Sequence, residues 1–248
     1  MDRSARRGGR AAAAAAAAAM TFAVLGALPA SAKPLDPATT TSTTAGDARL
    51  QQIKSDAASQ IANRVNDLNQ TIATLRSTSW LGADQSVLIG TAQGDITALT
   101  QLGATIAADT TVLAAQTHAA QITAGYRVYA LVIPVDHLVR ASDAVADLAV
   151  PELNSLAVTI NGLVTPANSA VIQPLLTDLT TQSAAAAHDV AGLPVQLEAD
   201  TPAQWNTNPG LLAPPTTAVH AAREAIAQAS KDAHTIIDDL THPAAAGH

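Results

Sequence analysis

Apolar residues recur at steps of three and four along most of this chain, the spacing that places them on one face of an α-helix. The clearest stripe lies between Asp47 and Arg76 and consists of Leu50, Ile53, Ala57, Ile61, Val65, Leu68, Ile72 and Leu75. The pattern predicts a helix over 47–76, with Asp47 as its N-cap. In the turn that follows, Trp80 and Leu81 are expected to fold over the end of a helical bundle.

Two aspartates mark where the next helices should begin. Asp84 precedes an apolar stripe that ends near Ile106, and Asp109 precedes a shorter one that ends near Ile122. An aspartate side chain can accept hydrogen bonds from the free N–H groups in the first turn of a helix. We therefore expect Asp84 and Asp109 to be N-caps.

Prolines are expected to interrupt, begin or kink the helices predicted for the middle of the chain. The stripe from Val135 to Leu163 is predicted to be helical and to be interrupted at Pro151. Another helix is predicted over 167–191, which Pro174 begins or kinks. Its apolar positions alternate by four and three, a rhythm typical of coiled coils.

The C-terminal part combines a long loop with a last helix. Residues 193–215 are rich in proline and asparagine around Trp205, and this composition predicts a loop. Residues 216–240 carry another stripe, about half of it alanine. Small side chains on that face would let the helix pack closely against a neighbour.

The segment Tyr126–Ile133 is ambiguous, because its β-branched and aromatic residues also suit a buried strand. No second strand of comparable quality is present, and a lone strand leaves its backbone groups unpaired. We therefore interpret the segment as a buried helix that runs up to Pro134, where the proline starts or kinks the next helix.

Together these patterns predict an all-α fold, an elongated antiparallel bundle of about five to six helices with coiled-coil-like packing. The bundle is expected to be one domain over residues 47–241. Residues 33–46 are rich in threonine and proline and cannot bury an apolar face, so they are predicted to be a disordered linker. Residues 242–248 are predicted to be a disordered tail.

The first 32 residues have the three parts of a secretory signal peptide. Four arginines make the start basic, residues 11–28 form an uninterrupted apolar run, and Ala30-Ser31-Ala32 is a small-x-small cleavage site. The alternative is a membrane anchor, because about twenty apolar residues can span a bilayer. The alanine-rich run and the well-formed site favour cleavage after Ala32. The sequence therefore predicts a secreted, extracellular protein with no membrane insertion after cleavage.

Composition and charge narrow the function classes. The chain has no cysteine, which excludes disulfides, thiolate metal sites and cysteine nucleophiles. Loss of residues 1–32 removes four arginines and Asp2, so nine basic and nineteen acidic residues remain, a net charge of −10. This charge repels nucleic acid and favours cationic ligands. A protein or a cell-envelope component is the expected partner, and leftover apolar stripes allow self-association.

Three side chains near the C-terminus have the spacing of a metal site. His234, Asp238 and His242 follow at steps of four on one helix face, and their nitrogen and oxygen ligands suit zinc. The alternative is an ordinary polar surface near a helix C-terminus, where the helix dipole favours histidine. Because His242 precedes Pro243 and no fixed fourth ligand is present, the sequence favours the polar surface, and we expect no cofactor.

Asp136 and His137 form a second candidate site. A histidine and a carboxylate placed in a cleft could perform acid–base work or bind a ligand. The simpler interpretation is a solvent-exposed helix face on which Asp136 pairs with Arg140, four residues later.

Three further residues are candidates for ligand binding. Arg127 follows Tyr126 in a very apolar segment, where a buried arginine needs a carboxylate or carbonyl partner. An ion pair between two helices is the expected role of Arg127, and anion recognition is the alternative. Trp205, together with Trp80, could form a small aromatic face, although loop tryptophans more often plug the end of a core.

The pattern Tyr126-Arg127-Val128-Tyr129-x-Leu131-Val132-x-Pro134, followed by Leu138-Val139-x-Ala141-x-Asp143, resembles a motif of uncharacterised secreted helical proteins from high-GC Gram-positive bacteria. The later Trp205-Asn206-x-Asn208-Pro209-x-Leu211, ahead of an alanine-rich helix, resembles the same group. The resemblance covers most of the chain after residue 32. It implies export and a helical fold, and it supplies no activity.

Catalytic signatures are absent from the sequence. There is no G-x-S-x-G, S-x-x-K or H-E-x-x-H motif and no phosphate-binding glycine loop. We therefore expect a non-enzymatic secreted helical protein that serves as an interaction, scaffold or spacer module in the cell envelope or extracellular space. The alternative is an extracytoplasmic protein that binds a small ligand or a metal.

Overall fold

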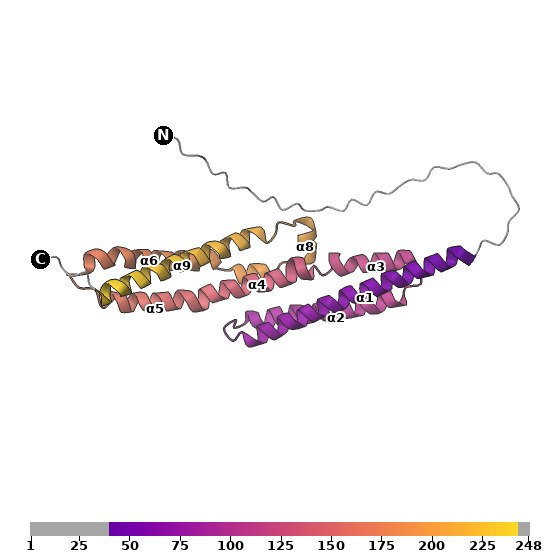
Figure 1. The fold of residues 1–248 in the computed structure, drawn as a ribbon, viewed down its shortest axis with the longest axis horizontal. Helices are drawn as coiled ribbons and strands as arrows, with labels where there is room; N and C mark the ends of the chain where they lie inside the picture. Colours follow the sequence, from indigo (N-terminus) through magenta and orange to yellow (C-terminus); the bar gives the residue numbers. More distant parts are fainter. Residues whose placement is uncertain (1–39, 243–248) are drawn as a thin grey trace, which may run out of the picture. The chain divides into compact units, whose positions relative to one another are not determined.

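The computed structural model describes residues 40–242, and over that range the protein is all-α, without a strand (Figure 1). The predicted signal peptide, residues 33–39 of the predicted linker and residues 243–248 of the predicted tail lie outside the described residues. The helices are α1 (Thr40–Ser77), α2 (Asp84–Ala108), α3 (Val112–Ala124), η1 (Val128–Val132), α4 (Ile133–Asp143), η2 (Ala144–Ala149), α5 (Val150–Asn161), α6 (Ser169–Val190), α7 (Leu193–Glu198), α8 (Pro202–Thr207) and α9 (Ala213–Thr241). Here η denotes a π-helical turn.

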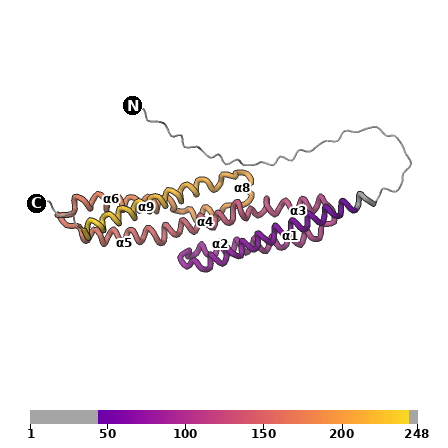
Figure 2. Tube along the Cα trace, in the orientation of Figure 1, coloured from indigo at the N-terminus to yellow at the C-terminus, as the bar shows by residue number. Residues whose placement is uncertain are grey.

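The helices surround three apolar clusters. One cluster lies among α1, α2 and α3, and another lies among α5, α6 and α9 (Figure 2). The third joins the end of α1 and the start of α2 to α4, α7 and α9. Because η1, α4, η2 and α5 follow without a break, the described residues form six helical rods longer than ten residues, in agreement with the expected five to six.

Helix α1 carries the predicted apolar stripe on its buried face. Six of the eight stripe residues are buried, and Ile53 and Val65 are half-buried. However, α1 begins at Thr40, so Asp47 is not its N-cap and residues 40–46 are helical, not a linker. The extension is physically reasonable, since each added helical residue gains a backbone hydrogen bond and no proline lies between residues 40 and 47.

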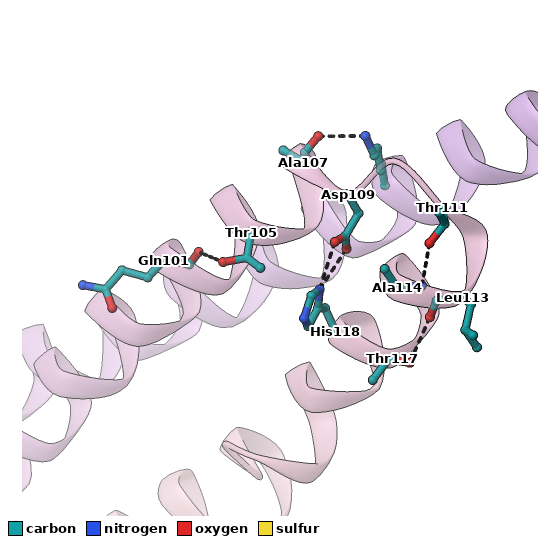
Figure 3. Close-up of polar contacts among 10 residues, drawn as sticks. Gln101, Thr105, Ala107, Asp109, Thr111, Leu113, Ala114, Thr117 and His118 are labelled. Carbon is teal, nitrogen blue, oxygen red and sulfur yellow. Dashed lines mark hydrogen bonds and ion pairs between the residues drawn. The ribbon is translucent and has the colours of Figure 1, made fainter.

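The N-caps predicted for the next two helices, Asp84 and Asp109, are also wrong. Ala83 is the N-cap of α2, and Asp84 is the first helical residue. Thr111 caps α3 by accepting a hydrogen bond from Ala114 N–H at 3.2 Å. Asp109 instead contacts His118 Nδ1 with both carboxylate oxygens, at 3.1 Å and 2.9 Å (Figure 3). Its side chain therefore fastens α3 to the end of α2.

The segment Tyr126–Ile133 contains no strand, and its helical interpretation is confirmed from Val128 onward. Two π-helical turns accommodate prolines. Ile133 N–H donates to Val128 O, and Val150 N–H donates to Val145 O, so each bond spans five residues and ends directly before a proline. A proline lacks an N–H and clashes with the carbonyl four residues back, and the wider turn relieves both problems. Consequently Pro151 does not interrupt the rod.

The predicted loop over 193–215 is largely helical, because α7 and α8 lie within it and α9 begins at Ala213. Each of these three helices has a proline in its first turn, where the missing N–H costs no hydrogen bond. A capping box also starts α8: Thr201 Oγ1 accepts from Gln204 N–H at 3.3 Å, and Gln204 Oε1 accepts from Thr201 N–H at 2.7 Å.

Helices α6 and α9 form the most extensive helix pair of the described residues. Small side chains occupy much of their buried faces, including Ser183 and Ala186 on α6 and Ala222, Ala229 and Ala233 on α9. This arrangement agrees with the close packing expected from the alanine-rich stripe. Among the described residues, no helix has the length and apolar character needed to span a membrane.

Candidate functional site

A pocket with a cavity volume of about 80 Å³ lies where α1, α2, η1, α4 and α7 meet. Four acidic side chains line it, and no lysine, arginine or histidine does. The acidic residues are Asp95, Asp136, Glu198 and Asp200. The apolar lining residues are Leu75, Leu88, Ala92, Leu131, Val132, Val135, Leu197 and Pro202, and Thr71 and Thr91 complete the wall. The pocket thus combines an apolar wall with an excess of carboxylates.

Helix periodicity explains how Asp95 reaches the pocket. Leu88, Ala92, Asp95 and Leu99 follow at steps of four, three and four, so the aspartate occupies a position on the apolar stripe of α2. Burial raises the pKa of Asp95 to about 6. An acidic residue on an apolar stripe was the sequence signal for this side chain, and sequence reasoning missed it.

Asp136 is the most buried of the four carboxylates, with only 3% of its surface exposed. Its Oδ2 accepts a long hydrogen bond from Arg140 Nη1 at 3.4 Å, which confirms the predicted i,i+4 pair, but the prediction that Asp136 lies on a solvent-exposed face is wrong. Its Oδ1 is buried without a hydrogen-bond partner. Burial raises the pKa of Asp136, although the charges of Arg140 and His137 oppose the rise. The carboxylate is therefore only partly compensated.

Glu198 ends α7, and Asp200 lies in the connection to α8. Glu198 Oε1 is a second buried carboxylate oxygen without a partner. Burial raises the pKa of both side chains, and the nearby charge of Asp84 raises that of Glu198 further. All four lining carboxylates are thus held in surroundings that disfavour their negative charge.

The structure does not bring the five predicted ligand-binding residues together in this pocket, because only Asp136 lines it. His137 is exposed, and it lines a separate shallow groove with Arg140. Tyr126 is half-buried against the cluster of α1–α3, and burial together with the charge of Asp95 raises its pKa. Trp205 and Trp80 both pack against the third apolar cluster, as expected of tryptophans that plug a core.

Within residues 40–242, Arg127 makes no ion pair with a carboxylate, contrary to the prediction. Its Nε donates to Asn206 Oδ1 at 2.6 Å, and Asn206 Nδ2 donates to Ala124 O at 2.9 Å. An amide is a sufficient partner because Arg127 is only half-buried. Its backbone has a φ of 47°, a left-handed conformation. Two residues later, Tyr129 donates its hydroxyl hydrogen to Asp67 Oδ2 at 2.7 Å. This motif therefore fastens η1 to α1 and α8.

Replacing Arg127 should separate the hydrogen bond from the backbone strain. Arg127→Ala and Arg127→Gly both remove the bond to Asn206, but only glycine adopts a φ of 47° without steric cost. The glycine variant should therefore be more stable than the alanine variant by about 1–2 kcal/mol in urea unfolding. Equal stability of the two variants would show that the left-handed conformation carries no strain.

The predicted metal triad does not form. His234 Nδ1 lies 2.6 Å from Ser230 O, and α9 ends at Thr241. His242 is the C-cap: its N–H still donates to Asp238 O at 2.8 Å, but its own backbone is not helical, with a φ of −127° and a ψ of 63°. Within residues 40–242, no three histidine or acidic side chains are placed to hold a metal ion.

The pair His118–Asp109 was also missed, because Asp109 is the C-cap of α2 and His118 lies in the middle of α3. The hydroxyl groups of Thr105 and Thr117 do not form a catalytic triad with His118 and Asp109, because both donate to backbone carbonyls. Thr105 Oγ1 donates to Gln101 O at 3.2 Å, and Thr117 Oγ1 donates to Leu113 O at 2.9 Å (Figure 3). Lys54 Nζ donates to Ala107 O at 2.7 Å, which covers a free carbonyl at the end of α2. These contacts position helices.

Comparisons with known proteins return no match among protein-family models, curated proteins or solved structures.

Proposed function

We propose that this chain is a non-enzymatic helical protein that binds a small ligand in the acidic pocket. The observation that carries the proposal is that Asp136 and Glu198 line the same cavity and that each has one buried carboxylate oxygen without a hydrogen-bond partner among the described residues. A buried charged group without a partner costs free energy, and a bound ligand that supplies hydrogen-bond donors removes that cost.

Binding explains the lining better than catalysis does. Among the lining residues there is no serine, cysteine, lysine or histidine, so the only hydroxyl groups are those of Thr71 and Thr91. A threonine hydroxyl is a weak nucleophile at its ordinary pKa and needs an adjacent base to activate it. The pocket therefore supports recognition of a ligand.

The place of action follows from residues 1–32. We propose that the chain is exported and acts outside the cytoplasm, as its basic start, apolar run and small-x-small site indicate. The resemblance to secreted helical proteins supports the same location. The second role, an interaction, scaffold or spacer module, requires only a packed bundle and makes no use of the pocket, so the pocket favours ligand binding.

Equilibrium dialysis tests the proposal. The full-length chain is dialysed against culture fluid of its own source, and the small molecules on both sides are compared by mass spectrometry. We expect one compound in excess on the protein side. Thr71→Leu places extra volume on the pocket wall and should abolish the excess, whereas Ala73→Leu, exposed on the same helix, should retain it.

The absence of any excess compound would overturn ligand binding in favour of the spacer role. An excess that survives Thr71→Leu would place the ligand elsewhere on the protein.

The protein recovered from the same culture fluid should begin at Lys33, and an intact N-terminus would contradict cleavage after Ala32.

A further inference from the structure

We infer that the ligand of the acidic pocket is a small aliphatic ammonium ion, that is, an amine with a short alkyl chain. This inference rests on the proposed function and identifies the chemical class of the ligand. It joins three properties of the cavity: the sign of its charge, the character of its walls and its size.

The charge selects a cation. Four carboxylates line the pocket. In the part of the chain that the structure describes, Arg140 is the one cation that hydrogen-bonds to any of them, and it reaches only Asp136 Oδ2. An anion would be repelled, and a neutral hydrocarbon would leave Asp136 Oδ1 and Glu198 Oε1 unpaired. An ammonium group carries three N–H donors and one positive charge, so it can donate hydrogen bonds to the lining carboxylates and offset part of their charge.

The walls select an organic cation over a metal ion. Four leucines, from α1, α2, η1 and α7, line the cavity beside the carboxylates. Calcium and magnesium take six or more oxygen ligands, many of them water, and would leave these leucines against water. The carboxylates are also not placed for metal coordination in the described residues. An alkyl chain instead buries its surface against the leucines.

The size limits the chain. The cavity volume of about 80 Å³ is smaller than the roughly 150 Å³ of an engineered apolar cavity that accommodates benzene. An aliphatic chain of a few carbons therefore suits the pocket, and an aromatic or steroid amine does not. n-Butylamine is a suitable probe, because butan-1-ol and butyrate have the same chain with a neutral or a negative end.

The protonation of the protein gives an independent readout. An alkylamine has a pKa near that of lysine, about 10.4, so it stays cationic from pH 5 to pH 8. Asp95, with a pKa of about 6, changes from mostly neutral to mostly charged over the same range. Arg140 and His137 are the basic groups beside Asp136, and Asp84 and Asp143 are the further acidic groups beside Glu198. Binding should therefore strengthen as the pH rises.

The experiment is a titration of the ¹⁵N-labelled full-length chain with each probe, followed by amide chemical shifts. At pH 8, n-butylamine should shift amides around the pocket saturably, butan-1-ol should bind at least about tenfold more weakly, and butyrate should not bind. At pH 5, n-butylamine should bind several-fold more weakly than at pH 8. Calcium chloride should not compete with it.

Variants assign the effect to the pocket. Asp136→Asn keeps the shape of the side chain and should weaken n-butylamine binding by about tenfold or more. Glu198→Gln provides the same test if Asp136→Asn does not fold. Glu224→Gln removes one negative charge from an exposed position on α9 and should bind n-butylamine like the parent chain.

The outcomes separate the two proposals. Equal binding of butan-1-ol and n-butylamine would overturn the ammonium inference and leave a small-ligand pocket. Competition by calcium that is lost in Asp136→Asn would overturn it in favour of a metal site. If no probe shifts the pocket amides, the ammonium inference fails, and the dialysis experiment then decides whether the pocket binds a different compound. An unchanged affinity in both carboxylate variants would also overturn it.

Discussion

Replacing Asp143 with asparagine should raise the free energy of unfolding at pH 8 by about 1–3 kcal/mol and by a clearly smaller amount at pH 5. Asp143 is the last residue of α4, only 5% exposed, and its Oδ2 is buried without a hydrogen-bond partner. Most buried polar substitutions destabilise a protein. Here the opposite sign is expected, because the aspartate itself is unfavourable when charged.

The cause is a group of acidic side chains around Asp143. Burial and the charges of Asp84, Asp147 and Glu198 raise the pKa of Asp143 from 3.8 to about 7. These groups lie on α2, η2 and α7, so acidic side chains from three different elements lie near Asp143. A carboxylic acid that keeps its proton at this site can donate a hydrogen bond to Asp84, whereas two carboxylates repel each other.

The direction of the pH effect follows from proton linkage. Between about pH 4 and pH 7, the folded protein holds a proton on Asp143 that the unfolded chain has released. The contribution of this residue to stability is therefore fully present below about pH 4 and is lost as the pH rises to about 7. Asparagine never acquires the charge, so the variant avoids the loss at pH 8.

Urea unfolding of both proteins at pH 5, 6, 7 and 8 measures this difference, and a Tm increase of roughly 3–10 °C at pH 8 should accompany it. Asp239→Asn, on the exposed face of α9, removes the same charge from solvent and should show no such pH dependence. A stabilisation of Asp143→Asn that is equal at pH 5 and pH 8 would contradict the linkage.

Replacing Ala229 with leucine should lower the free energy of unfolding by about 1–3 kcal/mol. Ala229 is fully buried in the cluster that joins α9 to α5 and α6. Added side-chain carbons must find room in a cluster that already contains the fully buried Leu179 and Ile236. The expected loss comes from overpacking, because the substitution preserves apolar character and helix propensity.

Ala227→Leu is the matched control, since it adds the same side chain two residues away on the exposed face of α9. Its free energy of unfolding should stay within about 0.5 kcal/mol of the parent value. Urea unfolding of the two variants at one pH decides the prediction. If Ala229→Leu is as stable as Ala227→Leu, then the packing of α9 against α6 does not require a small side chain at residue 229.

The all-α fold could be predicted because helix periodicity is a local property. The stripe from Leu50 to Leu75 appears within one segment of sequence, and the same residues are buried or half-buried in α1. The segment from Val128 to Ile133 was assigned correctly by a global rule, that a lone strand cannot satisfy its backbone. Helix ends were predicted less well, because Asp47, Asp84 and Asp109 each resembled an N-cap and none of them is one.

The sequence by itself therefore determined the long helices and the face that each of them buries, since both follow from contacts three and four residues apart, but it missed α7 and α8 in the predicted loop. Only the tertiary structure decided what the acidic residues do. Asp95, Asp136 and Glu198 are separated by 41 and 62 positions in the chain, and they share a pocket because α2, α4 and α7 meet there. Conversely, His234 and His242 are close in sequence, yet His242 follows the last residue of α9 and its backbone is not helical. Burial among distant elements, which no local pattern records, is what makes these carboxylates a candidate site.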